Sequence, residues 1–131
     1  MTSIKRSIPF LLLAAQVFAH HSVAAEFDVN RTVTVEGHVD KVQWLNPHVL
    51  IWVKAPNGST VQLELLPPNV LKRQGINQDL VKEGDPLTVT FWPAKDRASN
   101  VGNALTFVLG DGRKIEFPRN LGWNATFPAP K

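Results

Sequence analysis

Hydrophobic and polar residues alternate along several short stretches of the chain, and this predicts a protein built mainly of β-strands. In RTVTVEGHVDKVQW (31–44), valines alternate with polar residues at the period of two that is typical of a half-buried strand. Gly37 interrupts the apolar side of this strand and indicates a bulge or a sharp bend. HVLIWVKA (48–55) and STVQLELL (59–66) predict two further strands, joined by a hairpin turn at Asn57-Gly58.

The pattern changes after the third strand. In PPNVLKRQG (67–75) the two prolines can open a helix but cannot continue a strand, and Gly75 is placed to end that helix. A fourth strand follows through Leu87, Val89 and Phe91, and NALTFVLGDGRKIEF (103–117) predicts a fifth strand with a short partner. Three meandering strands, one short helix and two more strands follow the order of an OB-like Greek-key barrel. We therefore predict an all-β fold with one short helix, a small OB-like β-barrel of five to six strands.

The first 19 residues have the layout of a secretory signal peptide. Lys5 and Arg6 precede an apolar run over residues 8–15, and the segment ends on small residues at Ala19. We predict cleavage after Ala19 and a periplasmic or secreted protein. Cleavage after Ala25 also satisfies the small-residue rule and stays open. The apolar run falls short of the ~20 residues that a transmembrane helix needs, so we expect no membrane span and a soluble mature protein.

The 131 residues suffice for one domain. After the signal peptide (1–19) we expect an N-terminal segment with a histidine pair (20–31), an OB-like barrel domain (32–117) and an irregular C-terminal tail (118–131). Within the barrel, AKDRASNVGN (94–103) is polar and contains glycine, which predicts a flexible loop between the fourth and fifth strands.

Charge and cysteine content narrow the possible partners. Loss of Lys5 and Arg6 with the signal peptide lowers the formal charge from +3 to +1. A nearly neutral domain without a basic cluster argues against nucleic acid as a partner, because that affinity comes mainly from basic side chains at phosphates. The chain has no cysteine, so we expect no thiolate chemistry and any metal to be held by nitrogen and oxygen.

The four histidines provide the candidate metal ligands. If cleavage follows Ala19, His20 offers its amino group and its Nδ1 to one metal ion, and the amine titrates near ~8. His48 opens the second strand after Pro47, which makes it the best further ligand, and His21 is a third candidate. Three nitrogen ligands in a planar arrangement favour Cu(II). Copper is thus the predicted metal, held by His20, His48 and His21.

Each of these residues also has a simpler interpretation. His48 suits a histidine at the barrel rim that hydrogen-bonds to turn carbonyls, and His38 suits a solvated strand face. A His20-His21 pair just after a signal peptide also suits a disordered end. Glu26 and Asp28 are candidates for a carboxylate that orients an imidazole, or for a solvated turn, and Phe27 between them is expected to anchor the segment to the barrel.

The distance between His20 and His48 is the main test of the copper hypothesis. About 12 residues of the first strand separate the start of the barrel from His48, or ~40 Å if that strand is straight. Residues 20–31 could cover that length only when nearly extended. A bend at Gly37 would shorten it.

A ligand-binding module without metal is the alternative function. Trp44, Trp52, Trp92 and Trp123 are many for a domain of this size, and core packing accounts for at least two of them. OB barrels often bind ligands with exposed aromatic side chains on the second and third strands. Trp52 could thus bind a small ligand, a glycan or an envelope protein. Lys95 and Arg97 could contact an anionic group of it, and a solvated loop explains these two residues equally well.

Standard catalytic motifs are absent from the sequence. It contains no G-x-S-x-G, no H-E-x-x-H and no phosphate-binding glycine loop, so enzymatic activity has no positive support unless the copper site is redox-active. A redox copper enzyme is therefore a third interpretation.

A set of short motifs, spread over the predicted mature chain, is similar to a family of exported bacterial proteins of unknown function. The motifs are HHS, EFD, G-x-V, W-x-N-P-H, L-x-x-x-G, GD and DGR, found here at His20 to Ser22, Glu26 to Asp28, Gly37 to Val39, Trp44 to His48, Leu71 to Gly75, Gly84-Asp85 and Asp111 to Arg113. The resemblance implies export and a small barrel, and no reaction. Phe91-Trp92-Pro93 at the end of strand four is bulkier than the family pattern. The position of His20 also resembles that in proteins that hold copper with an N-terminal histidine.

Overall fold

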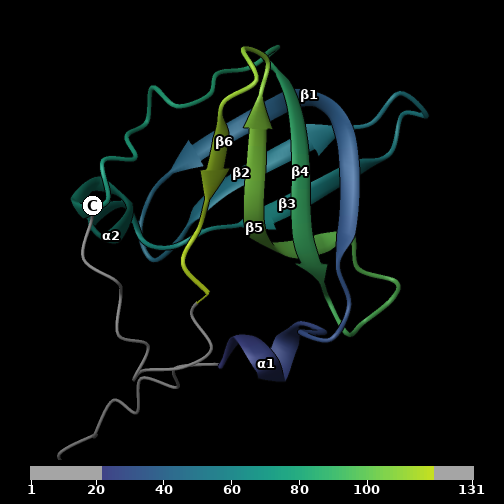
Figure 1. The fold of residues 1–131 in the computed structure, drawn as a ribbon. Helices are drawn as coiled ribbons and strands as arrows, with labels where there is room; N and C mark the ends of the chain where they lie inside the picture. Colours follow the sequence, from purple (N-terminus) through teal and green to yellow (C-terminus); the bar gives the residue numbers. More distant parts are fainter. Residues whose placement is uncertain (1–21, 120–131) are drawn as a thin grey trace, which may run out of the picture.

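The computed structural model describes residues 22–119, which form six strands and two short helices (Figure 1). In chain order these are α1 (Val23–Glu26), β1 (Val33–Trp44), β2 (Val49–Lys54), β3 (Thr60–Glu64), α2 (Pro68–Arg73), β4 (Pro86–Pro93), β5 (Val101–Leu109) and β6 (Lys114–Glu116). The predicted strands and the predicted helix after the third strand are confirmed. His20 and His21 lie outside the described residues, as do the predicted signal peptide and most of the predicted tail.

The strands close into a barrel with OB-like topology. β1 pairs with both β2 and β4, β2 pairs with β3, and β4 pairs with β5, all antiparallel. A short parallel pairing between β3 and β5 closes the ring, and β6 adds an outer strand to β5. The prediction of an OB-like Greek-key barrel is confirmed.

The long strand β1 curves across the barrel and changes partners along its length (Figure 1). Its first half pairs with β4, its second half with β2, and His38 pairs with Lys54 on one side and Pro86 on the other. The register with β2 shifts between Val39 and Lys41, so the irregularity falls just beyond the predicted position. Gly37 serves a different purpose, because a methyl group there would overlap the carbonyl oxygen of Lys54.

The barrel interior is filled by the inward-facing residues of these strands. Val49, Ile51 and Val53 on β2 are almost completely buried, while the residues between them are partly exposed. At the β5 side, the rings of Phe107 and Phe117 meet edge to face with centroids 4.7 Å apart. The period of two read from the sequence therefore corresponds to a real inner and outer face.

The helix α2 and the β2–β3 turn form as their residues predict. Pro67 and Pro68 begin α2, and Gly75 follows it with a φ of 76°. In the turn, Gly58 has a φ of 85°, and the side-chain oxygen of Asn57 accepts hydrogen bonds from both the backbone N–H and the hydroxyl of Ser59. Only the glycine of the Asn57-Gly58 pair uses a positive φ.

The loop between β4 and β5 is shorter than predicted. Residues 101–103 belong to β5 and pair with β3, and Gly102 and Asn103 also pair with β4. This part of the prediction was wrong because the polar sequence of the segment conceals strand pairings that depend on distant residues.

A second apolar cluster fixes the N-terminal segment to the barrel. Phe27, Trp92 and Leu105 are buried together, and Val23 and Val29 pack against them. Phe27 also forms a bridge with Ala94, which confirms its predicted role as an anchor. Within the described part of the chain, no helix has the length and apolar character needed to cross a membrane.

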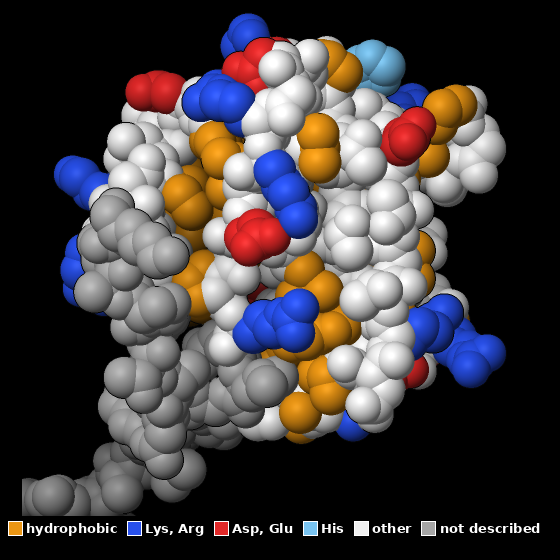
Figure 2. All heavy atoms as spheres, viewed as in Figure 1, with side chains coloured by type: hydrophobic (Ala, Val, Ile, Leu, Met, Phe, Trp, Pro, Cys, Tyr) orange, Lys and Arg blue, Asp and Glu red, His pale blue; other side chains and the backbone are white. Residues whose placement is uncertain are grey.

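The face that carries β4 to β6 shows no single sign of charge. Figure 2 shows basic and acidic side chains interspersed on this face, with hydrophobic side chains visible between them. Two of the pairs that contribute are Lys114 with Glu116 and Arg113 with Asp111, at 2.9 and 2.7 Å. Acidic and basic side chains therefore occur together on this surface.

Candidate functional site

His48 is held in a fixed orientation at the start of β2. The cis peptide bond between Asn46 and Pro47 precedes it, and its Nδ1 lies 2.8 Å from the carbonyl oxygen of Leu65. Because a carbonyl oxygen can only accept, Nδ1 carries the proton in this contact. In the neutral ring the lone pair then resides on Nε2, the form in which imidazole binds a metal ion.

Glu64, at the end of β3, lies beside the same imidazole. Its Oε1 is 3.4 Å from Nδ1 of His48, and its side chain is 24% exposed. Burial raises the pKa of the Glu64 carboxyl, His48 lowers it, and the negative charge of Glu26 raises it further. A nearby cation would therefore stabilise the ionised form of the Glu64 carboxylate.

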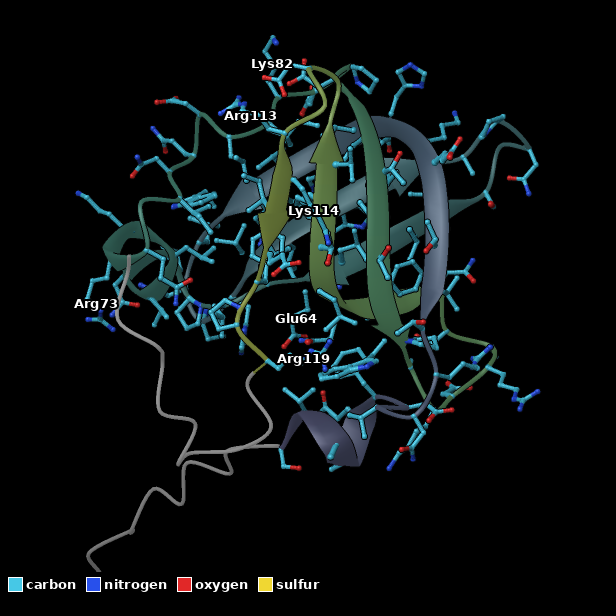
Figure 3. The ribbon with its side chains drawn as sticks, in the orientation of Figure 1. Glu64, Arg73, Lys82, Arg113, Lys114 and Arg119 are labelled. Atoms are coloured by element: carbon cyan, nitrogen blue, oxygen red, sulfur yellow. The ribbon has the colours of Figure 1, made fainter. Side chains whose placement is uncertain are left out.

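Glu64 also marks the end of the barrel at which this histidine lies. Figure 3 shows Glu64 at the end that faces α1, whereas Lys82 and Arg113 lie at the opposite end. The end with Glu64 is the one that the N-terminal segment approaches.

A small cavity of about 30 Å³ lies between α1 and this end of the barrel. A cavity needs only ~10–15 Å³ of such space to hold one water molecule. Its polar side chains are the imidazole of His48, the carboxylate of Glu64 and the amide of Asn103, and the other lining residues are Val23, Leu65, Leu66, Ala104, Phe117 and Pro118. The cavity thus has the size and the donor atoms for one small polar guest.

Val23 brings the N-terminal segment to His48, since both line this cavity. A nearly extended course of residues 20–31 was expected only if the first strand were straight, and β1 is curved (Figure 1). Residues 23–26 form a helical turn, a second turn follows at 29–30, and the curvature of β1 supplies the rest of the approach. The curved strand β1 thus returns the chain to the cavity that Val23 also lines.

The predicted carboxylates have different environments. Glu26 lies on α1 close enough to Glu64 for their charges to interact. Asp28 instead accepts a hydrogen bond from the backbone N–H of Asn30 and pairs with Arg31 at 3.8 Å. Asp28 therefore shapes the turn that leads into β1.

The histidines differ in the same way. His38 is exposed on β1 and pairs with the far end of β2, so it does not line the cavity at His48. Within residues 22–119, no group of three or more histidine, aspartate or glutamate side chains is arranged to hold a metal ion. His20 and His21, the other predicted ligands, precede Ser22 and lie outside these residues.

The residues of the alternative ligand site do not share one place. Trp52 is partly buried on the outer face of β2, with Nζ of Lys41 4.8 Å from its ring centroid. Lys95 donates from Nζ to the carbonyl oxygen of Ala24 at 2.6 Å, so it holds α1. Arg97 lines a separate pocket of about 330 Å³ that includes neither Trp52 nor Lys95.

The other tryptophans divide between core and surface. Trp92 is buried in the cluster with Phe27, and Trp44 packs partly against the main core. Trp123 lies outside the described residues. Core packing therefore accounts for two of the four, as the composition suggested.

Glu64 and Asn103 are the site residues that sequence reasoning missed. Glu64 stands at a polar position of β3 and resembles any solvated residue of an alternating strand. The signal was in the hairpin register, because counting back from the turn pairs Leu50 with Glu64 and so sets Glu64 next to His48. Asn103 had no such signal, since its place depends on the parallel pairing of β5 with β3.

The fold and this site together define a small OB-like β-barrel with an oriented histidine and a partly buried carboxylate at one end. Residues 10–103, well over half of the 131 residues, match the model of a family described as a family of unknown function (DUF6152). The chain belongs to this family. No curated protein and no solved structure matches this chain.

Proposed function

We propose that this protein is exported to the periplasm, loses residues 1–19, and binds copper at the end of the barrel that carries His48. The ligands are the amino group and ring nitrogen of His20 together with Nε2 of His48, and His21 is an additional candidate. With these ligands the protein would store, carry or sense Cu(II).

The observation that carries this proposal is that Val23 lines the same cavity as His48. His20 lies three positions before Val23, and three positions of extended chain span at most about 10 Å. An amino terminus at His20 is therefore within reach of the His48 ring without any rearrangement of the barrel.

The hydrogen bonding of His48 supports the same role. Its Nδ1 donates to the Leu65 carbonyl oxygen with the Glu64 carboxylate alongside, an arrangement that fixes the ring and increases the basicity of Nε2. Three nitrogen donors favour Cu(II) over harder cations such as Mg²⁺ or Ca²⁺. Glu64 then acts as a positioning residue, because its oxygen approaches Nδ1 rather than the metal-binding nitrogen.

The first experiment combines export and titration. The full chain is produced in a bacterial host with a periplasm, and the intact mass of the exported protein shows where it begins. Cu(II) is then added to the same sample and followed by electron paramagnetic resonance. A chain that begins at His20 and shows an axial, nitrogen-rich signal supports the proposal. A chain that begins at Glu26, or one that begins at His20 and binds no Cu(II) more tightly than a scrambled N-terminal peptide, contradicts it.

Two variants separate the metal-binding role of His48 from its structural role. His48→Asn keeps an N–H donor near the position of Nδ1 for the Leu65 carbonyl oxygen but has no nitrogen at Nε2. We expect this variant to fold and to lose the third nitrogen of the copper signal. His38→Gln removes an exposed histidine of β1, which pairs with the far end of β2, and is the matched control, which keeps the signal. An unchanged signal in His48→Asn would exclude His48 as a ligand.

A further inference from the structure

A second pocket, with a volume of about 330 Å³, is lined by valines, small polar residues and two arginines. The starts of β1, β3 and β5 and the end of β4 contribute to it, together with the loop after β4. It shares no lining residue with the cavity at His48. Ligand pockets usually measure ~300–1,000 Å³, so this one suits a small organic molecule.

About half of the pocket wall is apolar, and its apolar side chains are accessible. Val33, Val35, Val61 and Val101 are each only partly buried although all four line the pocket. The buried side chain of Phe91 also contributes to the lining, and its ring occupies the space that a side chain at Gly102 would need. An apolar group of a ligand would therefore complete the burial of four β-branched side chains.

The charged residues of the lining are all basic. Arg31 and Arg97 are both exposed, and no aspartate or glutamate is among the described lining residues. Arg31 is joined to Asp28 through Nε at 3.8 Å, which is longer than a hydrogen bond. The guanidinium groups of Arg31, which is also paired with Asp28, and of Arg97 favour an anionic guest.

The loop that carries Arg97 is ordered by its own hydrogen bonds. Oδ1 of Asp96 accepts from the backbone N–H of Ala98 at 3.0 Å, and the backbone carbonyl of Asp96 accepts from Ser99 at 3.1 Å. Asn100 in turn accepts from the N–H of Gln62 on β3 through its carbonyl oxygen. Arg97 is thus presented from a tethered turn, which lowers the entropic cost of engaging a ligand.

We propose that this pocket binds a small organic anion with an apolar body, whose carboxylate lies between Arg31 and Arg97 and whose hydrocarbon part contacts the valines and Phe91. The site is independent of copper. Arg97 is a candidate ligand-binding residue from the sequence as well. The other residues of this site are Arg31 and the lining valines, in place of the Trp52 and Lys95 that the sequence suggested.

The probe is hexanoate, added to the full exported protein and followed by calorimetry and by amide chemical shifts. Hexanamide, which has the same body without the charge, and acetate, which has the charge with little body, are the comparison compounds. We expect hexanoate to bind at least about tenfold more tightly than either, because hexanamide lacks the negative charge and acetate lacks most of the apolar body. Shifts should concentrate at Thr60, Val101 and neighbouring lining residues.

The variants Arg97→Gln and Arg31→Gln should each weaken hexanoate binding by about tenfold or more. Arg73→Gln is the matched control, because Arg73 is an exposed arginine on α2 and is not part of the lining. Equal binding of hexanoate and hexanamide, no effect of either arginine variant, or shifts centred on His48 would each overturn the proposal. Because both arginines are exposed, the variants should fold normally, which circular dichroism verifies.

Discussion

Lys95 and Ala24 are joined by a hydrogen bond of 2.6 Å from the lysine Nζ to the alanine carbonyl oxygen, across 71 positions of sequence. The backbone N–H of Lys95 also donates to the backbone carbonyl oxygen of Glu26 at 2.9 Å. The backbone N–H of Asp28 donates to the carbonyl oxygen of Pro93 at 2.9 Å. Together with Phe27 in its apolar cluster, these contacts hold α1 at the end of the barrel where His48 and Glu64 lie.

Replacing Lys95 with methionine should loosen α1 and leave the barrel intact. The side-chain hydrogen bond is lost while the backbone contacts remain, so we expect local opening to become easier by about 1 kcal/mol. Hydrogen exchange of the Phe27 and Asp28 amides measures this directly. Faster exchange at these two positions with an unchanged midpoint of unfolding is the expected result, and slower or unchanged exchange would show that the lysine does not fix α1. If the copper proposal holds, Cu(II) affinity falls as well.

Gly102→Ala should destabilise the protein because the new methyl group would overlap the ring of Phe91. Phe91 is buried against the barrel core and has little room to move, so we expect a loss of about 1–3 kcal/mol in the free energy of unfolding. Val108→Thr, at an exposed position of the same strand, is the control and should change stability by less than about 1 kcal/mol. Urea unfolding of both variants is the measurement, and a neutral Gly102→Ala would mean that the ring shifts freely.

Gly37→Ala should be the more damaging of the two glycine substitutions. There the overlap is with the backbone carbonyl of Lys54, which cannot rotate away as a side chain can. We expect a loss of about 3 kcal/mol or more, with β1 and β2 forced apart. The comparison of the two midpoints of unfolding tests this order, and a smaller effect at Gly37 than at Gly102 would contradict it.

Glu64→Gln should change the pH dependence of stability in a defined direction. Because burial raises the pKa of Glu64 above its usual value of 4.5, the folded protein holds this proton more tightly than the unfolded chain. The stability associated with Glu64 is therefore fully present below its unfolded pKa and is lost as the pH rises through its folded pKa. Glutamine removes that loss.

We expect the Glu64→Gln variant to be as stable as the parent below pH 4 and more stable at pH 7, by up to about 1 kcal/mol. Thermal unfolding across this range, without added metal, provides the measurement. A variant that is less stable at pH 7 would show that the carboxylate contributes more through its contact with His48 than it loses by burial. If Cu(II) binds at His48, the added positive charge should lower the pKa of Glu64. The difference in stability at pH 7 between the variant and the parent should then become smaller.

How much the sequence predicted can be seen in β2 and in α2. The alternation of Val49, Ile51 and Val53 with outward residues comes from the strand's own period, and Pro68 and Gly75 bound α2 through their own backbone preferences. These are local effects, so they could be read without knowledge of any neighbour. The order of strands around one helix then sufficed for the OB-like barrel, because few topologies accommodate it.

The candidate site was predictable in part. His48 stood out because Pro47 and a strand start surround it, and Arg97 because it lies in a polar loop. Glu64, Arg31 and the valines of the 330 Å³ pocket did not, because each is an ordinary member of a strand or turn until other strands are placed beside it. Lys95 was a candidate for an anionic ligand or for a solvated loop, and its hydrogen bond to the carbonyl oxygen of Ala24 depends on the distant N-terminal segment.

The sequence by itself determined the strands, the helix, the inner and outer faces and the candidate ligands, because each of these depends on residues a few positions apart. Only the tertiary structure decided that β5 begins at Val101, that β1 curves so that Val23 and His48 line one cavity, and that Arg31 and Arg97 line another. Those relationships depend on barrel closure, in which residues far apart in sequence become neighbours through pairing and burial that no local pattern encodes.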